Sequence, residues 1–130
     1  MLKNLLISSF VFCGLSFSWQ AQASIEEALT NICAIVIAND KSELRKKMKN
    51  VQSDFQMKLR DYYSGISCNG NSLIRLAVLN NATDVGTLLV KKMPKKHLAA
   101  PEQDGKTLQA WITEQGQQNN EIAVALVDRL

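Results

Sequence analysis

The stretch CNGNSLIRLAVLNNATDVGTLLVKKM, residues 68–93, decides the fold because it encodes two short helices joined by a tight connection. Its first four residues have the composition of a turn. Ser72 can cap a helix over residues 73–80, since a serine side chain accepts a hydrogen bond from the first helical turn. Thr83 begins a second helix, which Pro94 stops because proline lacks the N–H that a helix interior requires.

The apolar residues of these two helices recur at helical spacing, which predicts that one face of each helix is buried. The residues expected in the core are Leu73, Leu76, Val85, Leu88 and Leu89.

On the N-terminal side, two further amphipathic segments are expected. Ser24 with Glu27 forms a capping box for a helix that continues to about residue 38. Asp40 or Ser42 caps the next helix. That helix carries one apolar stripe, formed by Leu44, Met48, Val51, Phe55, Leu59 and Tyr62. Two readings stay open: one continuous helix up to Gly65, or a break near Ser53, where Ser53 and Gln56 offer another capping box. Tyr62 is expected in the core and its neighbour Tyr63 on the outside.

On the C-terminal side, residues 101–105 read as a loop, and Thr107 caps a helix that contains Trp111 as a core anchor. Residues 116–120 interrupt it, and residues 121–130 form the last helix. The alternation typical of strands is scarce along the chain. The sequence therefore predicts an all-α fold.

The first 23 residues have the pattern of a cleaved secretory signal. Lys3 precedes an apolar run over residues 5–17, and Ala21-Gln22-Ala23 matches the small-x-small pattern that signal peptidase accepts. The apolar run is short for a permanent membrane span, which needs about 20 residues. We therefore expect residues 1–23 to be removed and residues 24–130 to form one helical domain in the periplasm or outside the cell, with a membrane contact only through the leader.

The expected mature chain keeps two cysteines, Cys33 and Cys68, and an even count in an oxidising compartment favours one disulfide. Two unpaired thiols are the alternative. Closing a loop of this length would stabilise the fold by about 3.8 kcal/mol in the chain-entropy treatment.

Three helix pairs show self-similarity along the chain, over about residues 25–63, 70–94 and 105–130. Gly70, Ser72 and Leu73 recur at a shift of 35 residues, and Asn39 maps onto Asn80 at a shift of 41. A helix pair cannot bury its apolar face alone, so stacked neighbours would share one core. An irregular helical bundle is the competing interpretation.

The middle unit resembles an ankyrin repeat. Residues 70–77, GNSLIRLA, are similar to that family's G-x-T-P-L-H-x-A, and residues 85–89, VGTLL, to its V-x-x-L-L ending. Leu73 and Arg75 replace the family's proline and histidine, and Asn81 stands at its inter-helix glycine. The resemblance implies contacts with a partner through turn tips and first helices. The candidate binding positions are then Asn69, Asn71, Arg75, Asp104 and Lys106, although ordinary solvated turns explain the same residues.

The chain also resembles short exported bacterial proteins of unknown function. In these, a cysteine in an early helix is followed by Cys-Asn-Gly before a Ser-Leu helix, as at Cys33 and residues 68–73. This resemblance brings no activity with it.

Residues suited to catalysis or metal binding are few. His97 is the single histidine, and the spacing of the two cysteines does not match a metal site. We expect no catalytic residues, no metal, no cofactor and no enzymatic activity. The alternative is a thiol-dependent enzyme or redox factor of the cell envelope that uses Cys68, with His97 as the base.

The charge of the whole chain, +3, is too small to suggest nucleic-acid binding. We expect another envelope protein as the partner of a small, disulfide-stapled interaction module. Lysines and arginines gather in residues 41–49 and 91–96, where helix ends explain most such runs. Binding to an anionic surface through these clusters is a second alternative.

Overall fold

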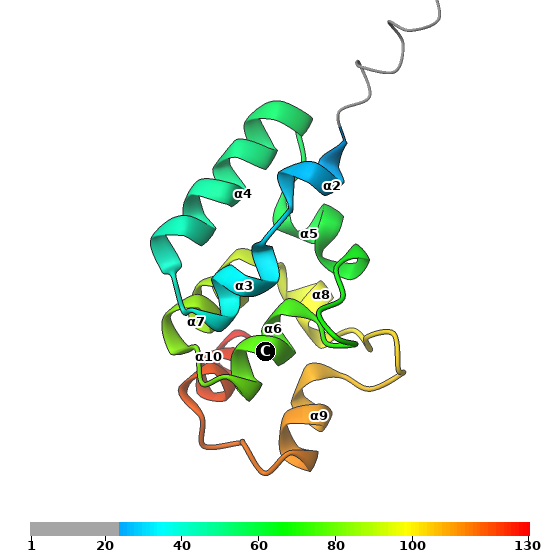
Figure 1. Ribbon diagram of the computed structural model, residues 1–130. Helices are drawn as coiled ribbons and strands as arrows, with labels where there is room; N and C mark the ends of the chain where they lie inside the picture. Colours follow the sequence, from blue (N-terminus) through cyan, green and yellow to red (C-terminus); the bar gives the residue numbers. More distant parts are fainter. Residues whose placement is uncertain (1–23) are drawn as a thin grey trace, which may run out of the picture.

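The computed structural model describes residues 24–130, and this part of the chain is all-α, as the sequence predicts (Figure 1). The predicted leader, residues 1–23, lies outside the described residues. The helices are α2 (Ile25–Ala28), α3 (Ile32–Ile37), α4 (Lys41–Phe55), α5 (Leu59–Tyr62), α6 (Leu73–Leu79), α7 (Thr83–Lys92), α8 (Lys95–Ala99), α9 (Leu108–Glu114) and α10 (Glu121–Arg129), with a 3₁₀ turn η2 (Tyr63–Gly65).

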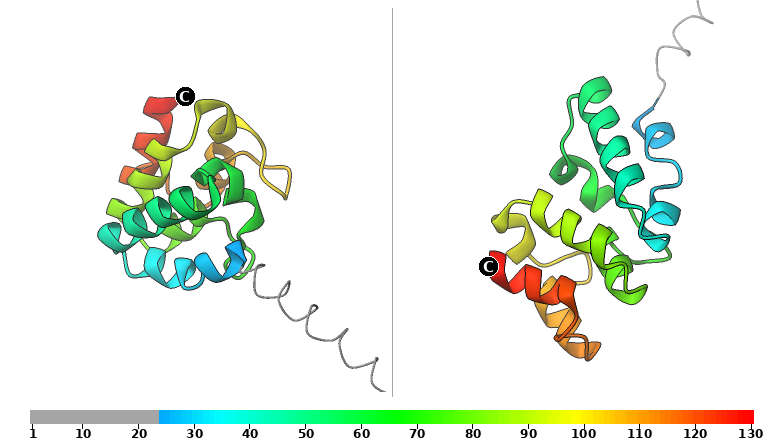
Figure 2. Two further views of the ribbon diagram at one scale, coloured as in Figure 1. Left: turned by 90° about the horizontal axis from the view of Figure 1, so that it is seen from above. Right: turned by 90° about the vertical axis from the view of Figure 1, so that its left-hand side faces the viewer.

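The helices form three successive pairs that lie side by side. α3 and α4 pack on α6 and α7, which in turn pack on α9 and α10, so that the middle pair is covered on both sides (Figure 2). The middle pair is accordingly the most buried, since six of the seven residues of α6 and five of the ten residues of α7 are buried. All five core residues predicted for residues 68–93 are buried, which confirms that prediction.

Side-chain caps begin several helices where the sequence places them. The Ser72 hydroxyl accepts the Arg75 N–H of α6, and the Thr107 hydroxyl accepts the Ala110 N–H of α9. Asp40 caps α4 by accepting the Glu43 N–H at 3.1 Å. Each cap satisfies a donor that the first turn of a helix leaves unpaired.

The turn inside each helix pair has the same hydrogen bonds. A left-handed residue follows the first helix in each case, at Asn39, Asn81 and Gly116. The next residue donates its N–H back into that helix, from Asp40 to Ile35, from Ala82 to Ala77 and from Gln117 to Ile112. The left-handed residue itself donates its N–H to the carbonyl three positions earlier, and this pair of bonds is the Schellman ending of a helix. By this turn geometry Asn39 is equivalent to Asn81. The sequence comparison matches Asn39 with Asn80, one residue earlier.

Two expected helices are divided in the structure. A left-handed Asn31 separates α2 from α3, and a left-handed Gln56 ends α4 before α5 begins at Leu59. The second segment therefore breaks at Gln56, three residues beyond Ser53. The Asp61 carboxylate caps the start of α5 by accepting the Lys58 N–H at 2.8 Å. The expected Ser53–Gln56 capping box does not form, because Ser53 lies inside α4 and the Gln56 N–H donates to the Gln52 carbonyl.

Helix α8 is an element that the sequence analysis did not assign. Pro94 supplies its N-cap with the fixed backbone angle that suits a helix start. Leu98 is its buried residue, and this burial positions the chain that runs from Pro101 to Asp104 across the molecule. No helix within residues 24–130 is long and apolar enough to cross a membrane.

Cys33 of α3 and Cys68, in the turn before α6, form a disulfide with their Cα atoms 5.9 Å apart. This separation lies inside the range that a disulfide requires. The bond joins the first pair to the turn that leads into the second pair, so the predicted bridge is confirmed.

Candidate functional site

A buried arginine organises the most polar region of the described chain. Arg75 lies on α6 and is only 6% exposed. Its Nη1 donates to Asp104 Oδ2 at 2.7 Å and its Nη2 to Asp104 Oδ1 at 3.0 Å, which is the bidentate geometry that suits a guanidinium. Nη2 also donates to the Lys106 carbonyl at 3.2 Å. The ring of Trp111 covers the guanidinium, with its centroid 5.0 Å from Cζ.

Glu102 is the second carboxylate of this cluster. Its Oε1 lies 2.7 Å from Arg75 Nε. The two atoms form an ion pair that lacks the geometry of a hydrogen bond. Its Oε2 accepts the Tyr63 hydroxyl at 2.9 Å. Burial, followed by the negative charge of Glu102, raises the pKa of Tyr63 well above its usual value, so this hydroxyl stays a donor. The expectation that Tyr63 points outward is wrong, because Tyr63 is buried like Tyr62 and this hydrogen bond satisfies its hydroxyl.

Asp104 and Lys106 close the cluster toward solvent. The Arg75 hydrogen bonds, followed by the Lys106 backbone N–H at 3.0 Å, hold the pKa of Asp104 well below its usual range. The Lys106 ammonium donates to Glu114 at 2.9 Å, and this partner raises the pKa of Lys106. The loop between α8 and α9 is thus fastened to both α6 and α9.

The structure brings together three of the five candidate binding residues, namely Arg75, Asp104 and Lys106. Arg75 points inward and bonds the other two, so its guanidinium is not displayed at a turn tip. Asn69 and Asn71 lie in the turn that Cys68 and Asn71 close with paired backbone bonds of 2.8 and 3.0 Å. Asn69 is exposed and left-handed, and Asn71 faces the pocket described next.

A pocket of about 500 Å³ opens beside the Arg75 cluster, between the segment 60–75 and the segment 93–104. Most of its lining residues are polar or charged, among them Arg60, Asn71, His97, Glu102 and Gln103, while apolar atoms contribute much of its surface. Gln103 donates to the Ser64 carbonyl at 2.9 Å and thereby joins the two walls. The disulfide at Cys68 fixes one wall, and the Arg75–Asp104 bonds fix the other.

His97 lines this pocket, whereas Cys68 is not among its lining residues and its sulfur is committed to the bond with Cys33. A disulfide sulfur is not a thiolate and cannot attack a substrate as one. Within residues 24–130, no group of three or more histidine, cysteine or acidic side chains is placed to hold a metal ion.

Sequence reasoning missed Tyr63 and Glu102 as members of this cluster. Their contact spans 39 residues, and nothing in local spacing indicates it. The sequence did contain a weak signal for these contacts. An arginine on the first helix of a buried pair requires acidic partners, and Glu102 and Asp104 are the acids of the loop at residues 101–105.

The fold and site define a small, disulfide-bridged helical domain with a polar pocket. Residues 32–100 match a family described as "Protein of unknown function (DUF3718)". The match covers more than half of the chain, and the chain belongs to this family. It includes both disulfide cysteines and Arg75, and ends before Glu102 and Asp104. Neither the curated proteins nor the solved structures contain a match.

Proposed function

We propose that this protein is an exported, non-enzymatic interaction module that binds a polar segment of another envelope protein in the pocket beside Arg75. The observation that carries the proposal is the pocket of about 500 Å³, whose two walls are held by a disulfide and by a bidentate ion pair. A rigid, preformed pocket with a few polar groups is suited to binding, because little ordering is needed when the ligand enters.

Two features support binding rather than thiol chemistry. The Cys68 sulfur is bonded to Cys33, and Cys68 is not among the residues that line the pocket with His97. The disulfide also supports export, since such bonds persist in oxidising compartments. The leader-like residues 1–23 agree with that location.

The stack of three helix pairs supports the finer proposal of an ankyrin-like architecture. Each pair ends its first helix with the same left-handed turn, and neighbouring pairs share one core. The pocket lies along the turns that precede α6 and α9, where ankyrin repeats generally present their contact residues. The partner would then meet exposed pocket residues rather than Arg75 itself.

A site-specific photocrosslinker distinguishes this pocket from the rest of the surface. We expect a crosslinker at His97, an exposed pocket residue, to capture a defined envelope protein in living cells. The same crosslinker at the exposed Gln118, beyond α9, should not capture it. Filling the pocket with Ala100→Trp should abolish the product, whereas Gln118→Trp should leave it unchanged. Equal capture from both positions, or none from either, would refute the proposed function.

A further inference from the structure

A second hollow lies on another part of the molecule and has a different chemistry. It has a volume of about 650 Å³ and opens between α4, the start of α5 and the end of α7. We call it the basic groove, because five of its lining residues are cations: Arg45, Lys46, Lys49, Lys58 and Lys92. We propose that the basic groove binds a phosphate-bearing ligand.

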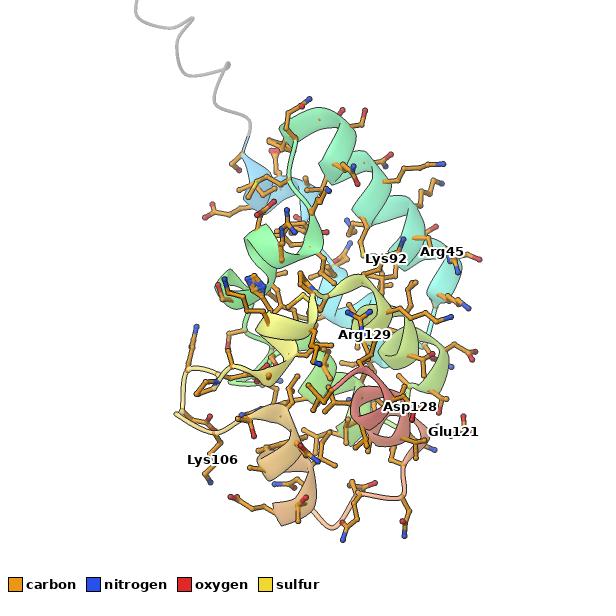
Figure 3. The ribbon with its side chains drawn as sticks, turned by 180° about the vertical axis from the view of Figure 1, so that it is seen from behind. Arg45, Lys92, Lys106, Glu121, Asp128 and Arg129 are labelled. Carbon is orange, nitrogen blue, oxygen red and sulfur yellow. A yellow bond between two sulfur atoms is a disulfide. The ribbon has the colours of Figure 1, made fainter. Side chains whose placement is uncertain are left out.

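The fold assembles this charge from segments far apart in the sequence. Arg45 and Lys49 stand one turn apart on α4, and Lys92 comes from the last turn of α7, which packs against α4. Figure 3 shows Arg45 and Lys92 on the same face of the molecule, one on each of these helices. Three cations of the first basic run therefore meet Lys92 of the second run in one groove.

The cations of the groove lack acidic partners. No carboxylate lines the groove, and within residues 24–130 none of its five cations forms an ion pair. Asp61, the nearest acid along the chain to Lys58, accepts the Lys58 backbone N–H and lies 4.0 Å from Arg60 Nε. Like charges one helical turn apart destabilise a helix, so Arg45 and Lys49 oppose the folding of α4 unless an anion screens them.

The shape and floor of the groove favour a phosphate-bearing ligand over a flat anionic contact. Met48 and Leu59 contribute apolar surface beneath the cations, and Gln52 adds an amide that can donate a hydrogen bond. Ammonium and guanidinium groups around a recess can each contact a different oxygen of a phosphate. A lipid headgroup at a membrane surface and a soluble diphosphate would satisfy the same groups, and the test separates them.

The test compares two double variants of equal charge. Lys49→Gln with Lys92→Gln removes two cations of the groove, whereas Lys95→Gln with Lys96→Gln removes two exposed cations outside it. Vesicles of phosphatidylglycerol and phosphatidylcholine probe the lipid source by co-sedimentation, and inorganic pyrophosphate probes the soluble source by NMR titration. Circular dichroism establishes that both variants are folded.

We expect the groove variant to lose about thirtyfold in binding, since each cation near a phosphate-rich surface contributes roughly a factor of five, while the control variant loses far less. Binding to phosphatidylglycerol vesicles with this difference identifies a lipid headgroup, and binding to pyrophosphate with this difference identifies a soluble ligand. Equal losses in the two variants would show unspecific charge attraction and overturn the proposal. Failure to bind either probe would overturn it as well.

Discussion

Gly86 of α7 lies directly against Ile122 of α10. A Cβ atom placed on Gly86 would stand 2.6 Å from Ile122 Cγ1, closer still to Ile122 Cδ1, and 3.2 Å from the Cβ of Ala77 on α6. Ile122 is fully buried and cannot move aside into solvent. The absence of a side chain at residue 86 therefore lets the second and third helix pairs approach each other closely.

The first prediction follows from this contact. Gly86→Ala should lower the free energy of unfolding by about 1–3 kcal/mol through overpacking, although alanine is the better helix former. Urea unfolding measures the change. Ile122→Val removes the methyl group that is closest to residue 86, so the double variant should recover part of the loss. An alanine at residue 86 that stabilises the protein would show that α7 and α10 do not pack in this way.

The second prediction concerns the buried arginine. Arg75→Met keeps most of the side-chain volume but leaves Glu102, which is 15% exposed, without its cation. Removing one partner of a buried ion pair strongly destabilises a protein, and because Asp104 is partly exposed we expect about 2 kcal/mol, below the full value for a deeply buried pair. Arg60→Met is the matched control, since Arg60 is exposed and its ion pair spans 4.0 Å. Equal losses of stability in the two variants would contradict an organising role for Arg75.

The third prediction is a pH dependence that originates from the same cluster. Arg75 lowers the pKa of Asp104 in the folded protein below its usual value of 3.8. A carboxyl group with a lowered pKa stabilises the fold fully above its unfolded pKa, and the stabilisation is lost as the pH falls through the folded pKa. The wild-type protein should therefore lose stability below about pH 4, and Arg75→Met should lose less. Thermal unfolding between pH 2 and pH 7 compares the two, and parallel curves would refute the coupling.

The sequence predicts the helices well because their signals are local. Each helix cap joins residues only three positions apart, as at Ser72, Thr107 and Asp40. The spacing of Leu73 and Leu76 likewise places both side chains on one buried face. The cysteine pair could also be predicted, because the compartment expected from residues 1–23 is oxidising and only two cysteines lie outside those residues.

The inward turn of Arg75 could not be predicted from local pattern. It depends on Asp104, 29 residues away, and on the placement of that loop by α8, whose five residues carry a single buried leucine. The Tyr63–Glu102 hydrogen bond spans 39 residues for the same reason. The basic groove likewise exists only because α7 returns its last turn to α4, an arrangement that neither lysine run indicates by itself.

The fourth prediction uses the two tyrosines, which are the only ones in the chain. Burial, with the charge of Asp61 as the second cause, raises the pKa of Tyr62 to about 12. A tyrosine whose pKa is raised in the folded protein stabilises the fold fully below its unfolded pKa of about 10. This stabilisation is lost as the pH rises through the folded pKa. Tyrosinate absorbance should therefore be nearly absent at pH 10 in the native protein. Ionisation at the value of a free tyrosine would refute the burial of both rings.

Tyr62→Phe isolates the contribution of this hydroxyl. The Tyr62 hydroxyl oxygen is buried and has no hydrogen-bond partner within the described residues. Removing an unpaired buried hydroxyl should leave the stability at neutral pH unchanged or slightly higher, because its desolvation is no longer a cost. A large loss of stability in Tyr62→Phe would indicate a partner for this hydroxyl.

The last prediction concerns the disulfide, on which both the stability and one wall of the pocket depend. Cys33 and Cys68 are separated by 35 positions in the sequence, and closing a loop of this size stabilises the fold by about 3.8 kcal/mol in the chain-entropy treatment. Cys33→Ala with Cys68→Ala should lower the free energy of unfolding by about this amount in urea. Reductant should destabilise the wild-type protein equally and leave the double variant unchanged. Alkylation of the non-reduced protein should modify neither Cys33 nor Cys68, whereas a reactive thiol at Cys68 would favour the redox alternative. Because the bond holds residues 67–72 at the pocket rim, the crosslink from His97 should weaken in the double variant even where it remains folded.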